Sequence, residues 1–160
     1  MLPITENALR GCFVNCTKGE AKRLAVPRDL AERPWPDLDF LGWRDPASRE
    51  RAYLVAESGG ELVGVALRVA PQANAVRRSM CSLCLTTHPG AGVSLMTARK
   101  SPQSASSVGT YICTDLACSL YLRGKKQTEP GGRLHESLTL AEKVDRTTAN
   151  LAGFLHRVRE

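Results

Sequence analysis

The chain has 160 residues, of which 42% are hydrophobic and 24% are charged. A chain of this length and composition can bury a core without disulfides, which excludes a disordered chain, a collagen and a coiled coil. No apolar run approaches the roughly 20 residues that cross a bilayer. Residues 1–7 have neither the basic nor the apolar region of a secretory signal. We therefore expect a cytoplasmic protein with no membrane partner.

The net charge of +6 is concentrated in one part of the chain. Residues 1–76 carry ten basic and ten acidic residues, and residues 129–160 carry five of each. Residues 77–128 carry seven basic residues and one acidic residue, Asp115, so the whole excess lies there. A concentrated positive charge favours an anionic partner such as RNA, DNA or an acidic protein face. The alternative is solvated surface charge that has no partner.

Two short helices are expected near the N-terminus. Residues 5–14 predict the first. Thr17-Lys18-Gly19-Glu20 fits a capping box, in which the threonine hydroxyl and the glutamate carboxylate accept from backbone amides, and predicts a second helix that ends near Leu24. Residues 27–46 hold four prolines and two tryptophans, which predicts an irregular segment pinned by aromatic side chains.

Two β-hairpins are expected in the middle of the chain. Residues 52–57 and 61–69 are rich in Val and Leu and are joined by Ser58-Gly59-Gly60, which suits a tight hairpin turn. Residues 93–97 and 108–112 predict the second hairpin. The fold class is therefore α+β, in which small antiparallel hairpins form a sheet with flanking helices.

Two further helices complete the expected elements. Residues 115–122 predict a helix with Thr114 as its N-cap and Gly124 beyond its end. Thr139-Leu140-Ala141-Glu142 is another capping box, and it starts a long C-terminal helix. The apolar stripe of this helix is expected to pack on the core, and it comprises Leu140, Val144, Leu151, Leu155 and Val158.

Four of the six cysteines have the spacing of a zinc site. Cys81 and Cys84 form a C-x2-C knuckle, and Cys113 and Cys118 follow after a hairpin-length insert. A knuckle, a hairpin and a helix that carries the last ligand are the layout of a treble-clef zinc finger. Zn²⁺ takes four tetrahedral ligands, and a shell of four thiolates leaves no open position, so such a site is structural. His88 is the reserve ligand if one cysteine is not used.

The remaining residues give little support for catalysis. No H-x-E, H-E-x-x-H, G-x-S-x-G or phosphate-binding glycine motif is present. A nucleophilic Cys16 paired with His88 or His135 is the enzymatic alternative. Cys12 and Cys16 are otherwise expected to be small core residues. We expect a binding protein that is not an enzyme and has no small-molecule substrate.

Four segments carry a family resemblance: Phe13-Val14-Asn15-Cys16-Thr17-Lys18-Gly19-Glu20-Ala21, residues 37–46, residues 79–84 and residues 111–118. They resemble the actinobacterial FBP-domain proteins, which are similar to the C-terminal treble-clef domain of FusB-type proteins. That resemblance implies a zinc-stabilised domain that binds elongation factor G, whose release from fusidic acid-stalled ribosomes FusB-type proteins promote. The zinc ligands then fall on Cys81, Cys84, Cys113 and Cys118.

The whole chain is expected to be one domain of three parts. Residues 1–76 supply the N-terminal helices, the aromatic segment and a hairpin, residues 77–128 the zinc finger, and residues 129–160 a polar linker and the last helix. An allosteric binding surface, without covalent chemistry, would then contact elongation factor G. An RNA- or ribosome-binding treble clef is the alternative function. The residues expected at the partner surface are Arg77, Arg78, Arg123, Lys125 and Lys126.

Overall fold

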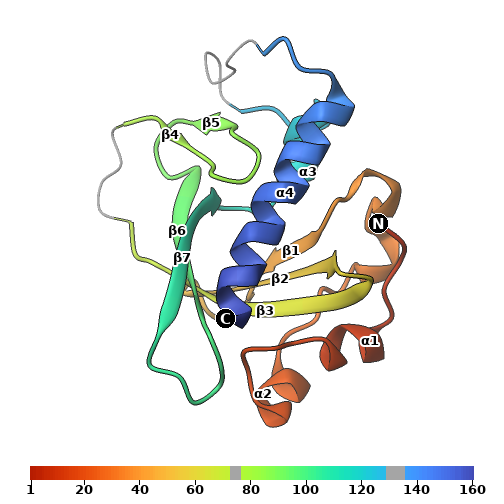
Figure 1. Cartoon of the computed structure of the whole chain (residues 1–160), viewed down its shortest axis with the longest axis vertical. Helices are drawn as coiled ribbons and strands as arrows, with labels where there is room; N and C mark the ends of the chain where they lie inside the picture. Colours follow the sequence, from red (N-terminus) through yellow and green to blue (C-terminus); the bar gives the residue numbers. More distant parts are fainter. Residues whose placement is uncertain (73–76, 129–135) are drawn as a thin grey trace.

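A computed structural model describes residues 1–72, 77–128 and 136–160 (Figure 1). Its centre is a five-stranded sheet in the order β1-β2-β3-β6-β7. Every pairing in the sheet is antiparallel, so the expected α+β class is confirmed. The strands are β1 (Leu41–Arg44), β2 (Arg51–Ser58), β3 (Glu61–Val69), β6 (Val93–Arg99) and β7 (Ser107–Cys113).

Both predicted hairpins are present. β2 and β3 pair along their full length, and the turn between them holds Gly59 and Gly60 at φ values of +63° and +81°. This left-handed backbone is accessible to glycine at little steric cost, which explains the Gly-Gly pair. β6 and β7 form the second hairpin, and two residue pairs join it to β3. The two hairpins therefore belong to one sheet.

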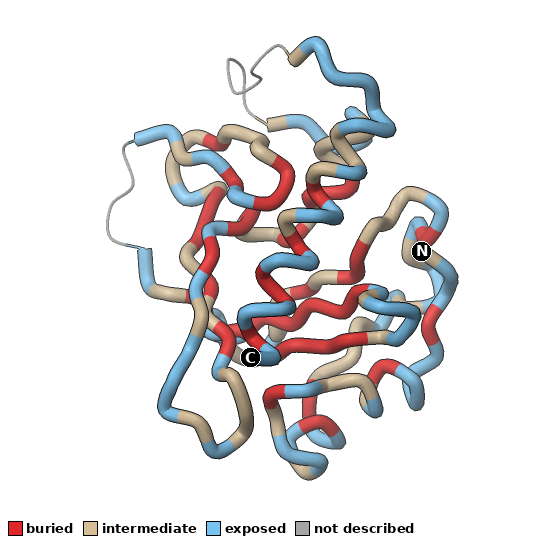
Figure 2. The backbone as a smooth tube through the Cα atoms, viewed as in Figure 1, coloured by how far each residue is buried: buried red, intermediate tan, exposed pale blue. Residues whose placement is uncertain are grey.

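Strands β2 and β3 are covered on both faces. On one face lies the long helix α4 (Leu140–Arg159), and on the other lie the N-terminal segments (Figure 1). β2 shows the consequence, because five successive residues of this strand are buried (Figure 2). Ala52, Leu54 and Ala56 belong to the cluster that α4 completes, whereas Tyr53 and Val55 belong to the N-terminal cluster. Because alternate side chains of a strand point to opposite faces, a strand that is buried on both faces has a continuous run of apolar residues.

Two short helices form at the N-terminus, as expected. They are α1 (Glu6–Gly11) and α2 (Lys18–Arg23), and the capping box at Thr17 is present. Arg10 joins them, because its guanidinium donates to the backbone carbonyls of Ala21, Lys22 and Leu24. These carbonyls belong to the last turn of α2, where helical hydrogen bonds run out. One arginine of α1 therefore closes the end of α2.

The first helix ends earlier than predicted because the following residues lie along the sheet. Phe13 makes a parallel bridge to Gly64, and the Asn15 side chain bonds both backbone groups of Ala66. The amide oxygen of Asn15 accepts from Ala66 N–H at 2.8 Å, and its nitrogen donates to Ala66 C=O at 2.9 Å. Asn15 is buried and replaces a strand partner at the part of β3 that β6 does not reach. This protects an otherwise open sheet edge.

The aromatic segment is more regular than the sequence predicts. It contains two 3₁₀ turns, η1 (Leu30–Glu32) and η2 (Trp35–Asp37), and then β1, which was not expected. Gly42 in β1 lies against the zinc-finger part of the chain, because a Cβ atom there would be 2.6 Å from the Cβ of Leu116. This contact, invisible in local sequence, requires a glycine in the strand.

The C-terminal half adds a two-stranded sheet of β4 (Ser79–Met80) and β5 (Thr87–His88), and the short helix α3 (Cys118–Leu122). α3 begins three residues later than predicted, and its N-cap is Ala117. Leu116 has a φ of +57°, which breaks the helix, so the expectation that Thr114 is the N-cap was wrong. The Thr114 hydroxyl donates instead to the carbonyl of Ala91.

The long helix α4 has the predicted capping box at Thr139, but its buried face differs from the predicted stripe. Leu140 is 47% exposed and lies outside the core. Every helix in the described part of the chain is too short or too polar to traverse a lipid bilayer. The residues that α4 buries are Thr147, Leu151, Phe154, Leu155 and Val158.

We predict that Asn15→Ala lowers the free energy of unfolding by about 2 kcal/mol, because it leaves two backbone groups of Ala66 without partners. Urea denaturation followed by circular dichroism measures the change. Asn7→Ala, at an exposed position of α1, is the control, and it should change stability by less than about 0.5 kcal/mol. Equal effects of the two substitutions would contradict the role given to Asn15.

Candidate metal centre

Three separate pieces of chain supply the four cysteines. Cys81 and Cys84 lie in the tight turn between β4 and β5, where Leu85 has a φ of +57° and donates its N–H to the carbonyl of Cys81. Cys113 is the last residue of β7, and Cys118 is the first residue of α3. The predicted order of knuckle, hairpin and helix is therefore the one observed.

The four sulfur atoms form a compact buried cluster, all within 4.8 Å of one another. The Sγ–Sγ distances are 3.7 Å for Cys81–Cys118 and 3.6 Å for Cys84–Cys113. Four thiolates at about 2.3 Å around a tetrahedral Zn²⁺ stand about 3.8 Å apart, whereas a disulfide brings two sulfurs to about 2.05 Å. The cysteines are free, so this donor set fits Zn²⁺.

Each buried thiol affects the protonation of its neighbours, because the sulfur atoms lie within hydrogen-bonding distance of one another. Hydrogen bonding to Cys113 and to the other sulfurs, together with burial, raises the pKa of Cys118, while the same neighbours lower the pKa of Cys81. The four sulfurs therefore cannot all become thiolates unless a cation compensates them. The N–H of Leu83 donates to the Sγ of Cys81 at 3.4 Å, which supports negative charge on that sulfur. Zn²⁺ would supply the missing charge, and its binding would release protons.

His88 lies beside the sulfur cluster but is not part of it. Its Nε2 atom is 3.2 Å from the Sγ of Cys113. Its ring packs edge-on against the ring of Tyr121, and the two ring centroids are 4.7 Å apart. Burial lowers the pKa of His88, which favours the neutral ring. Its position suits a hydrogen bond to a ligand sulfur, a contact that orients and tunes metal ligands. Gly92 makes room for it, because a Cβ there would be 2.3 Å from the Cβ of His88.

A polar network continues from His88 to the surface. The Tyr121 hydroxyl donates to Asp115 at 2.7 Å, and Lys126 pairs with the same carboxylate at 2.7 Å. Burial raises the pKa of Asp115, but the hydrogen bonds from Lys126 and Tyr121 outweigh it and lower the pKa below its usual value. Sequence reasoning singled out Asp115 only as the one acidic residue of its segment. Its contacts with Tyr121 and Lys126 arise from the fold.

The segment around β1 ties the N-terminal half to the metal centre. The Arg123 guanidinium makes a bidentate ion pair with Asp39, at 2.7 and 2.9 Å, and Lys125 pairs with Asp37 at 2.6 Å. Arg44 of β1 donates to the carbonyl of Thr114 at 3.1 Å. Acidic residues of the segment 37–46 therefore form ion pairs with the basic residues that follow α3.

The residues predicted to contact a partner divide into two groups. Arg123, Lys125 and Lys126 all have carboxylate partners within the chain. Arg77 and Arg78 are exposed and lie directly before β4, next to the knuckle. The structure therefore separates the five residues into a group paired with carboxylates after α3 and a pair of exposed arginines before β4.

The two N-terminal cysteines lie outside the metal centre. Both are partly buried against the N-terminal cluster, as expected of small core residues. Burial raises the pKa of Cys12 to about 11 and also raises the pKa of Cys16. The Nε2 of His88 lies at Cys113, not at Cys16, and His135 lies outside the described residues. A raised pKa makes a thiol a poorer nucleophile at neutral pH.

Comparison with known proteins agrees with the metal centre. Residues 8–158 match the family described as the FBP C-terminal treble-clef zinc-finger, and the chain belongs to this family. A segment of 42 residues is 48% identical to part of the tRNA N6-adenosine threonylcarbamoyltransferase of Paracoccus denitrificans (strain Pd 1222). That segment covers 26% of this chain and 12% of that enzyme, so the likeness concerns only a small part of each protein.

We predict that Cys84→Ser abolishes zinc retention and destabilises the protein by several kcal/mol, because structural zinc contributes folding free energy directly. Metal analysis of the purified protein should find about one zinc per wild-type chain and none in the variant. Thermal unfolding measures the stability. Cys16→Ser is the matched control, since Cys16 lies outside the four-cysteine cluster, and it should keep the zinc. Retained zinc in Cys84→Ser would refute the site.

The Asp39–Arg123 ion pair should have a coupling energy of about 1–3 kcal/mol in a double-mutant cycle of alanine substitutions, because both side chains are largely buried, with 10% and 15% exposed. The Asp37–Lys125 pair is the control. Lys125 is 55% exposed, so its coupling energy should be below about 1 kcal/mol. Chemical denaturation gives both values, and equal couplings would contradict this ranking.

Proposed function

We propose that this protein is a zinc-stabilised, non-enzymatic binding module for translation elongation factor G, and that it promotes release of the factor from the ribosome. The observation that carries the proposal is the closed four-cysteine centre in a chain that belongs to the FBP treble-clef family. FusB-type proteins, which carry this domain, bind that factor. The zinc would hold the knuckle, β7 and α3 in one fixed arrangement, and binding would use the surface around them.

A non-enzymatic role is supported by the chemistry of the centre. Four thiolates would fill a tetrahedral shell, so no position remains for water or substrate. A pocket of about 330 Å³ lies beside the centre and includes Arg44, His88 and Asp115. Two of its titratable groups already have partners, since Asp115 binds Tyr121 and Lys126, and the Nε2 of His88 contacts the Sγ of Cys113. No pair of groups there is arranged as a nucleophile and its base.

The module would act through differential affinity. A bound protein shifts a conformational equilibrium only as far as it binds one state more tightly than the other. Promotion of release therefore requires tighter binding to the factor in its ribosome-free or pre-release form. Exposed charges at the rim of such an interface act mainly on the association rate and its salt dependence.

An RNA- or ribosome-binding treble clef is the second candidate. Residues 77–114 contain basic residues and no aspartate or glutamate, which favours a polyanion. The two candidates differ in salt dependence, because affinity for RNA falls steeply with salt in proportion to the phosphates contacted. Titration of purified elongation factor G and of RNA at rising salt separates them.

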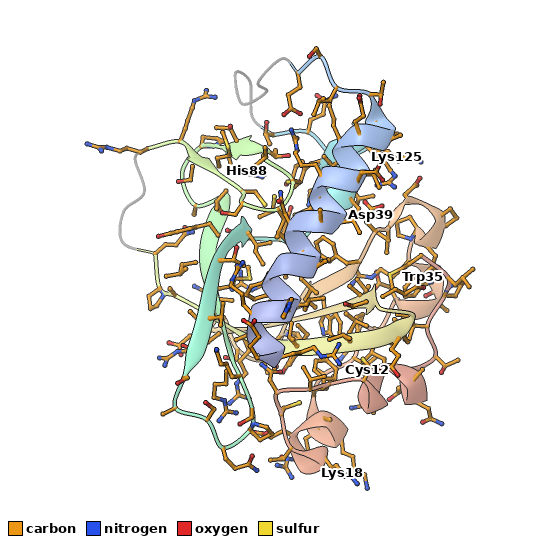
Figure 3. All side chains as sticks on the ribbon, viewed as in Figure 1. Cys12, Lys18, Trp35, Asp39, His88 and Lys125 are labelled. Carbon is orange, nitrogen blue, oxygen red and sulfur yellow. The ribbon has the colours of Figure 1, made fainter. Side chains whose placement is uncertain are left out.

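We predict that Arg77→Glu combined with Arg78→Glu weakens binding of elongation factor G about tenfold by reversing charge at the knuckle. Calorimetric titration measures the dissociation constant. Lys18→Glu combined with Lys22→Glu makes the same charge change on exposed residues of α2, at the other end of the molecule from His88 (Figure 3). This control should bind as the wild type does. Equal weakening by both variants would indicate long-range attraction, and no weakening would place the contact elsewhere.

A further inference from the structure

One part of the central sheet is covered on a single face. The N-terminal cluster covers the face opposite α4 with residues from β1, β2 and β3, and none of its members comes from β6 or β7. On β7 the odd-numbered residues Ser107, Gly109 and Tyr111 are exposed, whereas Thr110 and Ile112 are buried. The outer face of the β6–β7 hairpin is therefore open to solvent.

This open face has an apolar centre. Tyr111 is 53% exposed and stands opposite Leu95 of β6, and Gly109 stands opposite Thr97. The side chains of Leu95 and Thr97 lean over Gly109, because a Cβ there would be 3.2 Å from Leu95 Cδ1 and 3.3 Å from Thr97 Cγ2. Met80, in strand β4 of the two-stranded sheet, is 45% exposed and lies two residues before Ser82, whose N–H bonds to the carbonyl of Tyr111. An exposed tyrosine beside a glycine, with an exposed methionine near it in the chain, is typical of a binding surface.

The strand itself offers hydrogen bonds. β7 is the last strand of the sheet, so within the described residues no further strand pairs with its outer edge. The N–H of Ser82 donates to the carbonyl of Tyr111 at 2.8 Å, which shows that the backbone groups of Tyr111 point outward. Because this orientation alternates along a strand, those of Gly109 and Ser107 also point outward. Because the carbonyl of Tyr111 already accepts from Ser82, an extended peptide would bond as an added strand to the outward groups of Gly109 and Ser107.

The charged residues of the chain segment that forms this edge are all basic. No aspartate or glutamate occurs between residues 77 and 114, and the basic residues of this range stand at the two ends of the strip. Arg77 and Arg78 precede β4 at the Tyr111 end. Arg99 is the last residue of β6 and pairs with Ser107, and Lys100 follows it. Glu20 partly neutralises Arg99, at 3.5 Å. A segment that lies along β7 would meet positive charge at both of its ends.

We propose that the outer edge of β7, with Tyr111 and Met80 beside it, binds an extended acidic segment of a protein partner by strand addition. The proposal rests on the proposed function, since it names how the module would hold its protein partner. A peptide fits better than RNA, because main-chain groups at the edge match a peptide backbone. Among the described residues of this face, Tyr111 is the one exposed aromatic side chain. RNA binding by stacking of successive bases would need several such side chains.

Gly109→Pro tests the strand addition directly. It removes the outward N–H while leaving the bonds between β6 and β7 intact, and proline is tolerated at a sheet edge. Gly109→Ala adds the same Cβ but keeps the N–H, so it is the matched control. The proline variant should bind elongation factor G about tenfold more weakly, and the alanine variant within about twofold of wild type. Circular dichroism and zinc content verify that both variants fold.

A short acetylated peptide of alternating glutamate and valine tests the site without the factor. In ¹⁵N–¹H spectra of the full chain it should shift the amide signals of Gly109 and Tyr111, whereas a lysine–valine peptide and oligouridine should not. Equal losses in Gly109→Pro and Gly109→Ala, or the same shifts with oligouridine, would overturn the inference while leaving factor binding intact. If the factor fails to bind but the glutamate peptide shifts these signals, the proposed function fails and the edge site stands.

Discussion

Four sulfur atoms from three separate pieces of chain have to meet within a few ångströms, and this requirement governs the second half of the molecule. A zinc centre of four thiolates carries a formal charge of about −2 in a buried place, so the chain around it must stabilise negative charge. The amide of Leu83 and the ring of His88 are placed to do this. Residue 92 in turn has to be glycine, because His88 occupies the space that a side chain at this position would need. The demands of the metal thus reach residues that never contact it.

The zinc finger is not an independent unit attached to a sheet. Cys113 ends β7, a strand of the same sheet that begins with β1, and Met96 and Ile112 of its hairpin share one core with Phe154 of α4. The ion pair between Asp39 and Arg123 adds a second connection. Removal of the metal should therefore disturb the sheet and α4 together, because the same residues serve both the metal centre and the hydrophobic core.

Local chemistry made part of this architecture predictable. Both capping boxes, the Gly-Gly hairpin turn and the C-x2-C knuckle are set by neighbours in sequence, and each is where the pattern predicts. The features that escaped prediction depend on distant residues. β1 is a strand because β2 lies beside it, and Asn15 substitutes for a strand because β6 leaves part of β3 uncovered. α3 starts late because the chain turns at Leu116, against β1, before it can become helical.

The pairing of charges also depends on residues that are distant in sequence. A count of charges along the sequence identifies the positive excess but does not reveal which basic residues pair with carboxylates, because the ion pairs form across the fold. Arg123, Lys125 and Lys126 are matched by carboxylates that stabilise the junction of the two halves. At the tip of the β6–β7 hairpin, Arg99 pairs with Glu20 of α2. The acidic partner that we propose would therefore meet positive charge mainly at the knuckle and along β7, since Arg123, Lys125 and Lys126 stabilise the fold itself.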